Sequence, residues 1–317
     1  MKTINYLWAV LTMATLSLTA CSDESEDVQQ PQEKNAKVEL TLTGTPAETR
    51  ASGALPSSEG AIKTLAVGIF DHTSGTTNTI AEPTLSDGKY EISCTPDTCD
   101  IIVVANAPTG TFAGLTTKDA FIAKTVALSQ TAGDVQNAEN LPMSGKEEGV
   151  VLTAGNTVPQ SISISRLVAR ICINSIKTNF VPTGQYSKAT FKLKKVFLHN
   201  AMASSQVTPE AVPDTSNPQS GQNDNLNKYL QTVSSSEDII TTEAPHTTNY
   251  WFYTFANTAA GMTSKHTKLV IYEEFDPDGA GGIDHSDVYY PVVINKLQRE
   301  SSLKRSDQYH HRYSRQR

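Results

Sequence analysis

Alternation of apolar and polar residues with a period of two dominates this chain, and it predicts strands rather than helices. Val38–Thr43 and Ile162–Ser165 alternate cleanly, so each is expected to turn one face to a core and the other to water. Ile101–Ala105 is continuously apolar, which favours a central strand buried on both faces. Further segments with strand character are Ile62–Phe70, Leu167–Ile173, Phe191–Leu198, Trp251–Phe255, Leu269–Tyr272 and Tyr289–Ile294.

Helical signals are scarce. Thr117–Val126 is the best candidate, with Thr117 as an N-cap and Asp119 in the first turn, where the helix dipole favours an acid. One short helix among many strands indicates an all-β fold of the sandwich type. The turn Ala154–Thr157 precedes the strand expected to open a second domain, so the boundary is placed near residue 160.

Length and charge exclude some classes of function. The 317 residues allow about two domains. The chain has 26 Lys and Arg against 33 Asp and Glu, a net charge of -7, so nothing favours nucleic acid as a partner. The motifs of serine hydrolases, zinc peptidases and phosphate-binding loops are missing from the sequence. We therefore expect neither an enzyme nor a cofactor.

Three acidic residues, Asp276, Asp278 and Asp284, have the composition of a calcium-binding loop. The EF-hand pattern needs oxygen ligands at alternate positions and a glutamate at its end. Gly279 and Ala280 follow Asp278, which breaks that pattern. We therefore expect an Asp/Gly turn between two strands and no metal site.

The first twenty residues have the pattern of an export signal and are left out of the fold. Lys2 supplies the positive charge, and the apolar stretch Tyr6–Leu18 is shorter than the roughly 20 residues that a spanning helix needs. Leu18–Cys21 reads Leu-Thr-Ala-Cys, the pattern of a bacterial lipoprotein signal, in which Cys21 becomes the lipidated first residue. Several acyl chains on one cysteine anchor a protein stably to a membrane, because burying apolar chain is favourable.

The segment after Cys21 is acidic and then rich in Gln and Pro up to Gln32, which is typical of a solvated tether. Acidic residues directly after the lipidated cysteine also resemble the signal that sends some lipoproteins to the outer leaflet of the outer membrane. A generic linker is the alternative interpretation.

The other three cysteines permit more than one interpretation. Cys94 and Cys99 lie close together in the sequence, and an oxidising periplasm would join them in a disulfide that pins a hairpin. A reducing habitat would leave them as two thiols. Cys172 lies in an apolar run and is expected to be a small buried side chain.

The aromatic run Tyr250–Tyr253 has two interpretations. It has the composition of a platform on which sugars stack. The alternation of Trp251, Tyr253 and Phe255 is instead what a core-facing strand requires, and we expect these side chains in the core.

Arg50 follows a strand and a Gly-Thr-Pro turn, and it precedes the small residues Ala51–Gly53. Such a flexible position is accessible to an arginine-specific protease. Composition alone does not separate this site from an ordinary exposed arginine.

The order of these segments resembles the fimbrillin family, the FimA-type subunits of type V fimbriae. None of the segments is specific alone, and it is their order that carries the resemblance. They are Cys21, Asn35–Leu40, Arg50, Leu65–Phe70, Val103–Ala107, Leu141–Ser144, Ser165–Arg170 and Tyr289–Val292.

The resemblance implies two transthyretin-like Greek-key β-sandwich domains in tandem, with the short helix in the first. It divides the chain into a signal peptide (1–20), an acidic tether with a removable first strand (21–50), an amino-terminal sandwich (51–160) and a carboxy-terminal sandwich (161–317). The lipid-anchored precursor is expected at the cell outer membrane, and the mature subunit in an extracellular fimbria that serves adhesion.

The resemblance also implies a mechanism. An arginine-specific protease cuts between Arg50 and Ala51, and the first strand, with Val38, Leu40 and Leu42, leaves a groove that a strand of another fimbrial subunit fills. A host or bacterial receptor is a further expected partner, but the sequence does not identify it.

The carboxy terminus departs from the family. Family members continue past the position of Tyr309 with further alternating strands, whereas this chain ends in the basic, non-alternating stretch His310–Arg317. The second sandwich is therefore expected to be truncated and to lack a donor strand. A truncated gene and a cap that accepts a strand without donating one are the two explanations.

A monomeric outer-membrane surface lipoprotein that binds glycans is the alternative function. It would require exposed aromatic side chains, so Trp251 would then be accessible to solvent.

Overall fold

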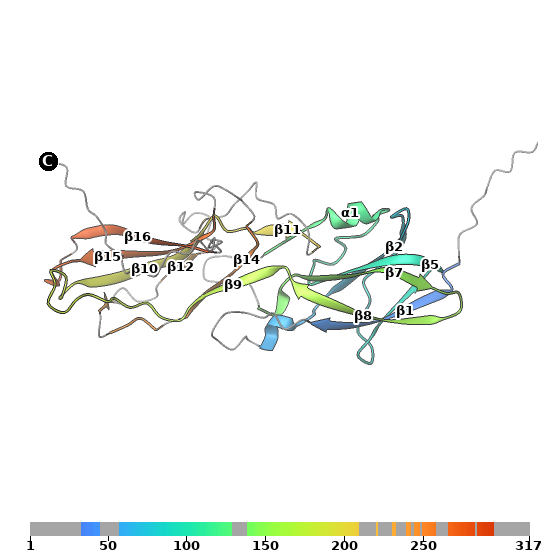
Figure 1. Cartoon of the computed structure of the whole chain (residues 1–317), viewed down its shortest axis with the longest axis horizontal. Coiled ribbons are helices and arrows are strands. Elements are labelled where there is room, and N and C mark those ends of the chain that lie inside the picture. Colours follow the sequence, from blue (N-terminus) through green and yellow to red (C-terminus); the bar gives the residue numbers. More distant parts are fainter. Residues whose placement is uncertain are drawn as a thin grey trace, which may run out of the picture. The chain divides into compact units, whose positions relative to one another are not determined.

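A computed structural model describes residues 33–44, 57–128, 138–208, 220, 230–232, 239–241, 244–247, 249–257, 266–282 and 284–294 (Figure 1). The elements of this part are strands, apart from one short α-helix and two 3-10 turns, which confirms the all-β prediction. Among the described residues, no helix has the length and apolar character needed to cross a bilayer.

Seven strands form one hydrogen-bonded path in the order β3-β2-β5-β7-β8-β1-β4. β7 and β8 share only two register pairs, at Met143–Arg166 and Ser144–Ser165, so the path bends there into two layers. One layer is β3-β2-β5-β7 and the other is β8-β1-β4. The bounds are β1 (Ala36–Gly44), β2 (Leu65–Asp71), β3 (Thr77–Ala81), β4 (Tyr90–Cys94), β5 (Asp97–Ala105), β7 (Met143–Leu152) and β8 (Thr157–Arg166).

The first core fills the space between these two layers, because each strand turns alternate apolar residues inward. β5 is buried along almost its whole length between β2 and β7, as expected for Ile101–Ala105. Gly145 lets β7 come close to β8, since a Cβ there would collide with the carbonyl oxygen of Ser163. The inward residues of the β8-β1-β4 layer are Ala36, Val38, Leu40, Tyr90, Ile92, Cys94, Ile162 and Ile164.

A second core covers the opposite face of β2 and β5. Phe121 of the helix α1 (Lys118–Ile122) lies over this face and stacks on Phe112 at a centroid distance of 4.2 Å. Thr117 caps α1 as predicted, since its side chain accepts a hydrogen bond from the Ala120 amide.

The helix ends earlier than the predicted Val126. Residues Thr125–Ala127 instead form strand β6, which pairs with β11 (Ser204–Gln206). Two β-branched residues in this segment favour the strand, and the ladder to β11 decides the outcome.

The rest of the described chain forms two further sheets and a third core. β9 pairs with β14, and the other sheet has the order β12-β10-β15-β16 with β13 beside β10. The third core lies between these sheets and contains Leu193, Val196 and Phe252. The bounds are η1 (Ser57–Gly60), η2 (Ala138–Asn140), β9 (Val168–Ile173), β10 (Thr190–His199), β12 (Leu230–Thr232), β13 (Ile239–Ile240), β14 (Tyr250–Phe255), β15 (Lys268–Asp276) and β16 (His285–Val293).

β14 is buried on both faces, which the sequence did not predict. Tyr250 and Phe252 face the third core, while Tyr253 and Phe255 face the second. The prediction that Trp251 is a core residue is wrong, because its side chain is 41% exposed. Trp251 lies opposite Cys172 at the end of the β9–β14 ladder, where the second core no longer covers this face.

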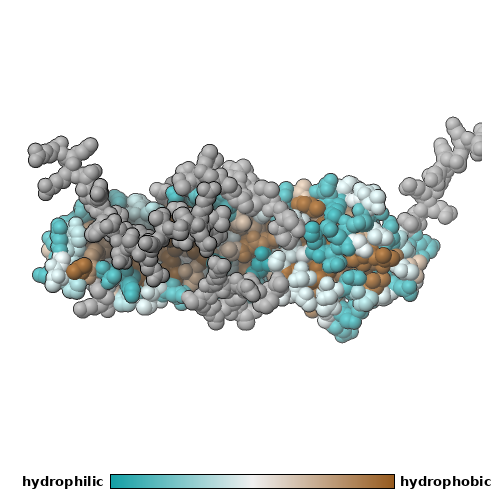
Figure 2. All heavy atoms as spheres, in the orientation of Figure 1, coloured by the Kyte–Doolittle hydropathy of each residue, from teal (hydrophilic) through white to brown (hydrophobic). Residues whose placement is uncertain are grey.

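Cys172 is also exposed, so the prediction that it is a small buried side chain is wrong for the same reason. Figure 2 shows a surface on which hydrophobic patches interrupt the hydrophilic side chains. The large apolar side chains exposed on it include Leu85, Val151, Val181, Tyr186, Ile239, Trp251, Tyr289, Tyr290 and Val292.

The predicted boundary at residue 160 falls inside β8, which stays in the layer of β1 as far as Arg166. The chain leaves the seven-stranded path only after that residue. The division into two domains remains a prediction.

Candidate functional site

β1 lies in the middle of its layer. It runs parallel to β8, with Lys37 opposite Thr157, and antiparallel to β4, with Val38 opposite Ile92. β1 therefore pairs along both of its edges, although it is the first strand of the described chain. Its removal would separate β8 from β4.

The inward side chains of β1 fit the predicted pattern. Ala36, Val38 and Leu40 are completely buried in the first core, and Leu42 is half-buried beside them. The three residues predicted for the removable strand therefore share one face. This face closes the core between the two layers.

The outward side of β1 carries two ion pairs and one long hydrogen bond, which the Thr43 hydroxyl donates to the carbonyl oxygen of Ile162 at 3.5 Å. Lys37 meets Glu91 at 3.1 Å and Glu39 meets Lys89 at 2.6 Å, both at the surface. Exposed pairs of this kind contribute about 0–1 kcal/mol. β1 is thus held mainly by backbone pairing and by alternate apolar side chains, both of which another strand of the same pattern can supply.

β4 is held independently of β1 at its carboxyl end. The amide group of Asn78 donates to the carbonyl oxygen of Thr95, and its oxygen accepts from the Thr95 amide, both at 2.9 Å. Among the described strands, β4 forms a ladder only with β1. The contact with Asn78 and the packing of Tyr90, Ile92 and Cys94 in the first core hold β4 without the help of the β1 ladder.

Cys94 and Cys99 are both buried in the first core, and both are free thiols in the structure. Burial raises the pKa of the Cys94 thiol, and burial followed by the charge of Asp97 raises the pKa of Cys99 to about 12. Because the thiolate is the reactive form, burial lowers the reactivity expected of both thiols in the folded chain. The disulfide remains a prediction, and it would have to form before the core closes.

Glu59 lies directly downstream of the predicted cleavage site, in η1, and is 3% exposed. Its carboxylate meets Arg170 at 3.1 Å and Arg166 at 4.0 Å, and it accepts a hydrogen bond from the Tyr253 hydroxyl at 2.8 Å. Burial, followed by this hydrogen bond, raises the pKa of the Tyr253 hydroxyl, which therefore remains a donor. Arg166 also donates to the backbone carbonyl oxygen of Glu59 at 3.4 Å.

Asn106 makes a second contact with this segment. It follows β5 and adopts a positive φ of 62°, which asparagine tolerates better than most residues. Its side-chain oxygen accepts from the amide of Lys63 at 2.8 Å, and its amide group donates to the carbonyl oxygens of Ala61 and Leu141. Thr64 adds a hydrogen bond to the carbonyl oxygen of Ala107 at 2.8 Å.

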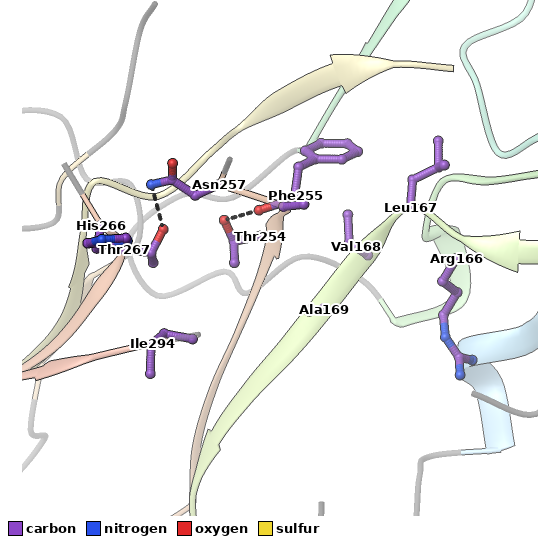
Figure 3. A pocket seen from close by; sticks show the side chains of 11 residues that line it. Arg166, Leu167, Val168, Ala169, Thr254, Phe255, Asn257, His266, Thr267 and Ile294 are labelled. Atoms are coloured by element: carbon purple, nitrogen blue, oxygen red, sulfur yellow. Dashed lines mark hydrogen bonds between the residues drawn. The ribbon is translucent and has the colours of Figure 1, made fainter. Parts of the chain in front are cut away.

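A pocket of about 250 Å³ lies where β9, β14, β15 and β16 come together (Figure 3). Val168, Phe255 and Ile294 give it an apolar lining, and Asn257 and Thr267 hydrogen-bond to each other at 3.1 Å. Figure 3 shows the Arg166 side chain pointing away from Asn257 and Thr267. Arg166 lines the pocket and also contacts Glu59, so the pocket borders the Glu59 contacts.

The acidic segment forms the predicted Asp/Gly turn between β15 and β16, whereas the absence of a metal site stays a prediction. Asp276 accepts hydrogen bonds from the amides of Asp278, Gly279 and Gly281, as in an Asp/Gly turn. These hydrogen bonds lower the pKa of the Asp276 carboxyl, and the bond from Gly281 has the largest effect. Carboxylate oxygens of Asp276, Asp278 and Asp284 come within 4.8 Å of one another.

Cys21, Arg50, Ala51 and the carboxy-terminal tail lie outside the described residues. The predictions of lipidation, cleavage and truncation remain predictions.

A profile described as major fimbrial subunit protein (FimA) matches residues 36–227, more than half of the chain. The chain belongs to the FimA family. The match begins at the first residue of β1 and covers both layers of the first sandwich. The resemblance expected from the sequence is thereby confirmed.

Solved structures of other bacterial proteins have a similar fold. A fimbrilin from Porphyromonas gingivalis W83 is 18% identical over 83% of this chain and 82% of its own, with a TM-score of 0.57. A protein from Parabacteroides distasonis described as a candidate cell adhesion protein is 19% identical over 84% of this chain and 82% of its own, with a TM-score of 0.63. A similarly described protein from Bacteroides eggerthii is 22% identical over 82% of this chain and 79% of its own, with a TM-score of 0.57. No curated protein matches the chain.

Membership of the FimA family indicates a structural subunit of a surface fimbria, rather than an enzyme. It also indicates that the partners of the chain are other fimbrial subunits.

Sequence reasoning missed the contacts around Glu59. Arg166 and Arg170 were part of the family resemblance but were given no role, and Tyr253 was expected to be a simple core residue. The available signal was the presence of two arginines in an otherwise apolar segment, because a buried strand carries charges only when they are paired.

Proposed function

We propose that this FimA-family chain is a fimbrial subunit that assembles by donor-strand exchange. An arginine-specific protease cuts between Arg50 and Ala51, β1 leaves, and a strand from another subunit takes its place. The observation that carries the proposal is the position of β1 between β8 and β4, with Ala36, Val38 and Leu40 completely buried.

The loss of β1 would create a site with strict requirements. The facing edges of β8 and β4 would present unpaired N–H and C=O groups, and the floor would be the apolar residues of the first core. Only an extended segment with alternate apolar residues satisfies both requirements, so the occupant is a strand. A contact of this kind is head-to-tail and does not close on itself, which generates a filament.

The order of the segments links cleavage to release from the membrane. Cys21, the proposed lipidated residue, lies on the same side of Arg50 as β1. One cut would therefore detach the subunit from its outer-membrane anchor and allow β1 to leave. Free subunits would then arise only where the protease acts, outside the cell.

A monomeric glycan-binding surface lipoprotein is the second candidate, and one observation favours it. The Trp251 ring is 41% exposed rather than buried, and an exposed indole is a surface on which a sugar ring can stack. The position of β1 has no role in this alternative.

Limited digestion with an arginine-specific protease tests the proposal. The chain would begin at Ser22, so that it is soluble, and it would be compared with its Arg50→Ala variant and with an Arg315→Ala control. We expect one dominant cut between Arg50 and Ala51 in the parent and in the control, and a stable complex between the cut chain and an added donor subunit.

Resistance at Arg50 while other arginines are cut would overturn the strand-release route. Trp251→Ala then decides the second candidate. Loss of binding on a glycan array by this variant, with its fold intact, would support a glycan-binding lipoprotein.

A further inference from the structure

We infer that the segment Glu59–Thr64 is a built-in anchor that retains the new amino terminus of the subunit once β1 has left. The inference rests on the proposed cleavage at Arg50. It adds a positioning role for Glu59 and Asn106, neither of which touches β1 or the incoming strand.

The first half of the anchor is the Glu59 carboxylate. It is enclosed by Arg170, Arg166 and the Tyr253 hydroxyl, which come from β9, β8 and β14. A buried carboxylate is stable only with such partners, and no other position of η1 offers a charge to these arginines. The contact is therefore specific to this one residue.

The second half is Asn106, which binds the chain two to five residues further on. The side-chain oxygen of Asn106 accepts a hydrogen bond from the amide of Lys63, and its amide group donates to the carbonyl oxygen of Ala61. The hydroxyl of Thr64 donates to the carbonyl oxygen of Ala107, the residue after Asn106. Together the two halves fix the chain from Glu59 to the start of β2 at Leu65. None of these contacts involves a residue of β1.

Cleavage changes what the anchor has to do. In the intact chain the segment is connected to β1 on one side and to β2 on the other, so both strands limit its motion. The cut at Arg50 removes the covalent link to β1, so the segment then depends on the contacts of the anchor. The anchor then keeps the chain end from fraying back along β2 and from re-entering the open groove.

The backbone amide of Lys63 donates a hydrogen bond to the side chain of Asn106. Its hydrogen-exchange rate, measured in cut and in uncut protein, tests this role. A recognition sequence for an unrelated, site-specific protease would replace residues 45–50, so that the cut does not depend on Arg50. The parent, Glu59→Gln and the exposed control Glu148→Gln would be compared. Tyr253→Phe, which removes the hydroxyl that donates to Glu59, serves if Glu59→Gln does not fold.

We expect Glu59→Gln to speed exchange in residues 59–64 by about tenfold more in the cut protein than in the uncut protein. Tyr253→Phe should act in the same direction with a smaller effect, and Glu148→Gln should have none. An equal effect before and after the cut would overturn the anchor, since it would make Glu59 a stabilising residue with no link to cleavage. Failure of the proposed function would appear separately, as resistance of the natural Arg50 site.

Discussion

The two segments on either side of Arg50 are held in the fold by different means. β1, upstream, is fixed by a backbone ladder on each edge, by alternate apolar side chains and by ion pairs at the surface. The segment Glu59–Thr64, downstream, is fixed by a buried carboxylate between two arginines and by the side chain of Asn106. The first set of contacts can be made by any alternating strand, whereas the second requires particular residues at particular positions.

This difference suits a chain in which one segment is exchanged and its neighbour is kept. A strand that another strand must replace cannot depend on side chains that only it possesses. A segment that must remain gains from contacts that no incoming strand can imitate. The boundary between the two modes falls between Gly44 and Glu59, the interval that contains Arg50.

The reactivity of the Cys94 thiol is the most sensitive test of whether β1, unlike the segment Glu59–Thr64, can leave the fold. The partner of Cys94 in the β1–β4 register is Ala36, so departure of β1 uncovers the thiol. We expect iodoacetamide to modify Cys94 at least about a thousandfold faster after release of β1 than before, as measured by peptide mass. Cys172, already exposed, should react equally in both states, and a Cys94 rate that does not change would contradict exposure of the groove.

Arg170→Met tests the downstream segment. It removes the closer of the two positive partners of Glu59 and leaves that carboxylate buried with incomplete compensation. Such a change costs about 3–5 kcal/mol of unfolding free energy, measured by denaturant titration. Combination with Glu59→Gln should recover a large part of the loss, because the buried charge is then gone. A loss below about 1 kcal/mol would mean that the contacts of Glu59 stabilise the protein no more than surface ion pairs do, which would contradict the prediction.

Glu273 of β15 is a second buried acid that can be compared with Glu59. Burial is the cause of its pKa shift, whereas Glu59 lies against two arginines. Burial raises the pKa of Glu273 to about 7 from 4.5. The folded state therefore binds the proton more tightly than the unfolded state, and unfolding free energy falls as the pH rises from about 4.5 to about 7. Glu273→Gln should remove this dependence and stabilise the protein above pH 7 by roughly 3 kcal/mol at most. Parallel pH profiles of parent and variant would contradict the assignment.

Lys37→Ala should have the smallest effect. Lys37 and Glu91 are both about half exposed, so the loss of their ion pair changes the unfolding free energy by about 0–1 kcal/mol. Salt titration of the parent and the variant measures this difference. A loss of several kcal/mol would mean that β1 depends on its own side chains and is poorly suited to exchange.

Local pattern was enough to predict that β1 is a strand with one buried face. Val38 and Leu40 could be assigned to a core face because a strand alternates strictly, and Thr117 could be assigned as a cap because its side chain acts on its own turn. These properties depend on neighbours in the sequence. For the same reason, β5 could be recognised from its unbroken apolar run.

What could not be predicted depends on residues that are distant in the sequence. Glu59 meets Arg170 and Tyr253, more than a hundred positions away, and no local pattern encodes that meeting. Trp251 shows the complementary failure. Alternation predicted correctly that Trp251 shares a strand face with Tyr253 and Phe255. The second core covers that face only as far as Tyr253, and this limit depends on how β14 pairs with β9.

The parallel pairing of β1 with β8 also bears on the order in which the chain folds. Lys37 pairs with Thr157, 120 positions later, and no hairpin can bring them together. Contacts of such long sequence separation form late, because much chain entropy is lost before they contribute. During export, which delivers the amino terminus first, β1 waits for its partner until most of the sandwich has emerged. The strand that is proposed to leave first is then also the one inserted last, so exchange would retrace the final step of folding.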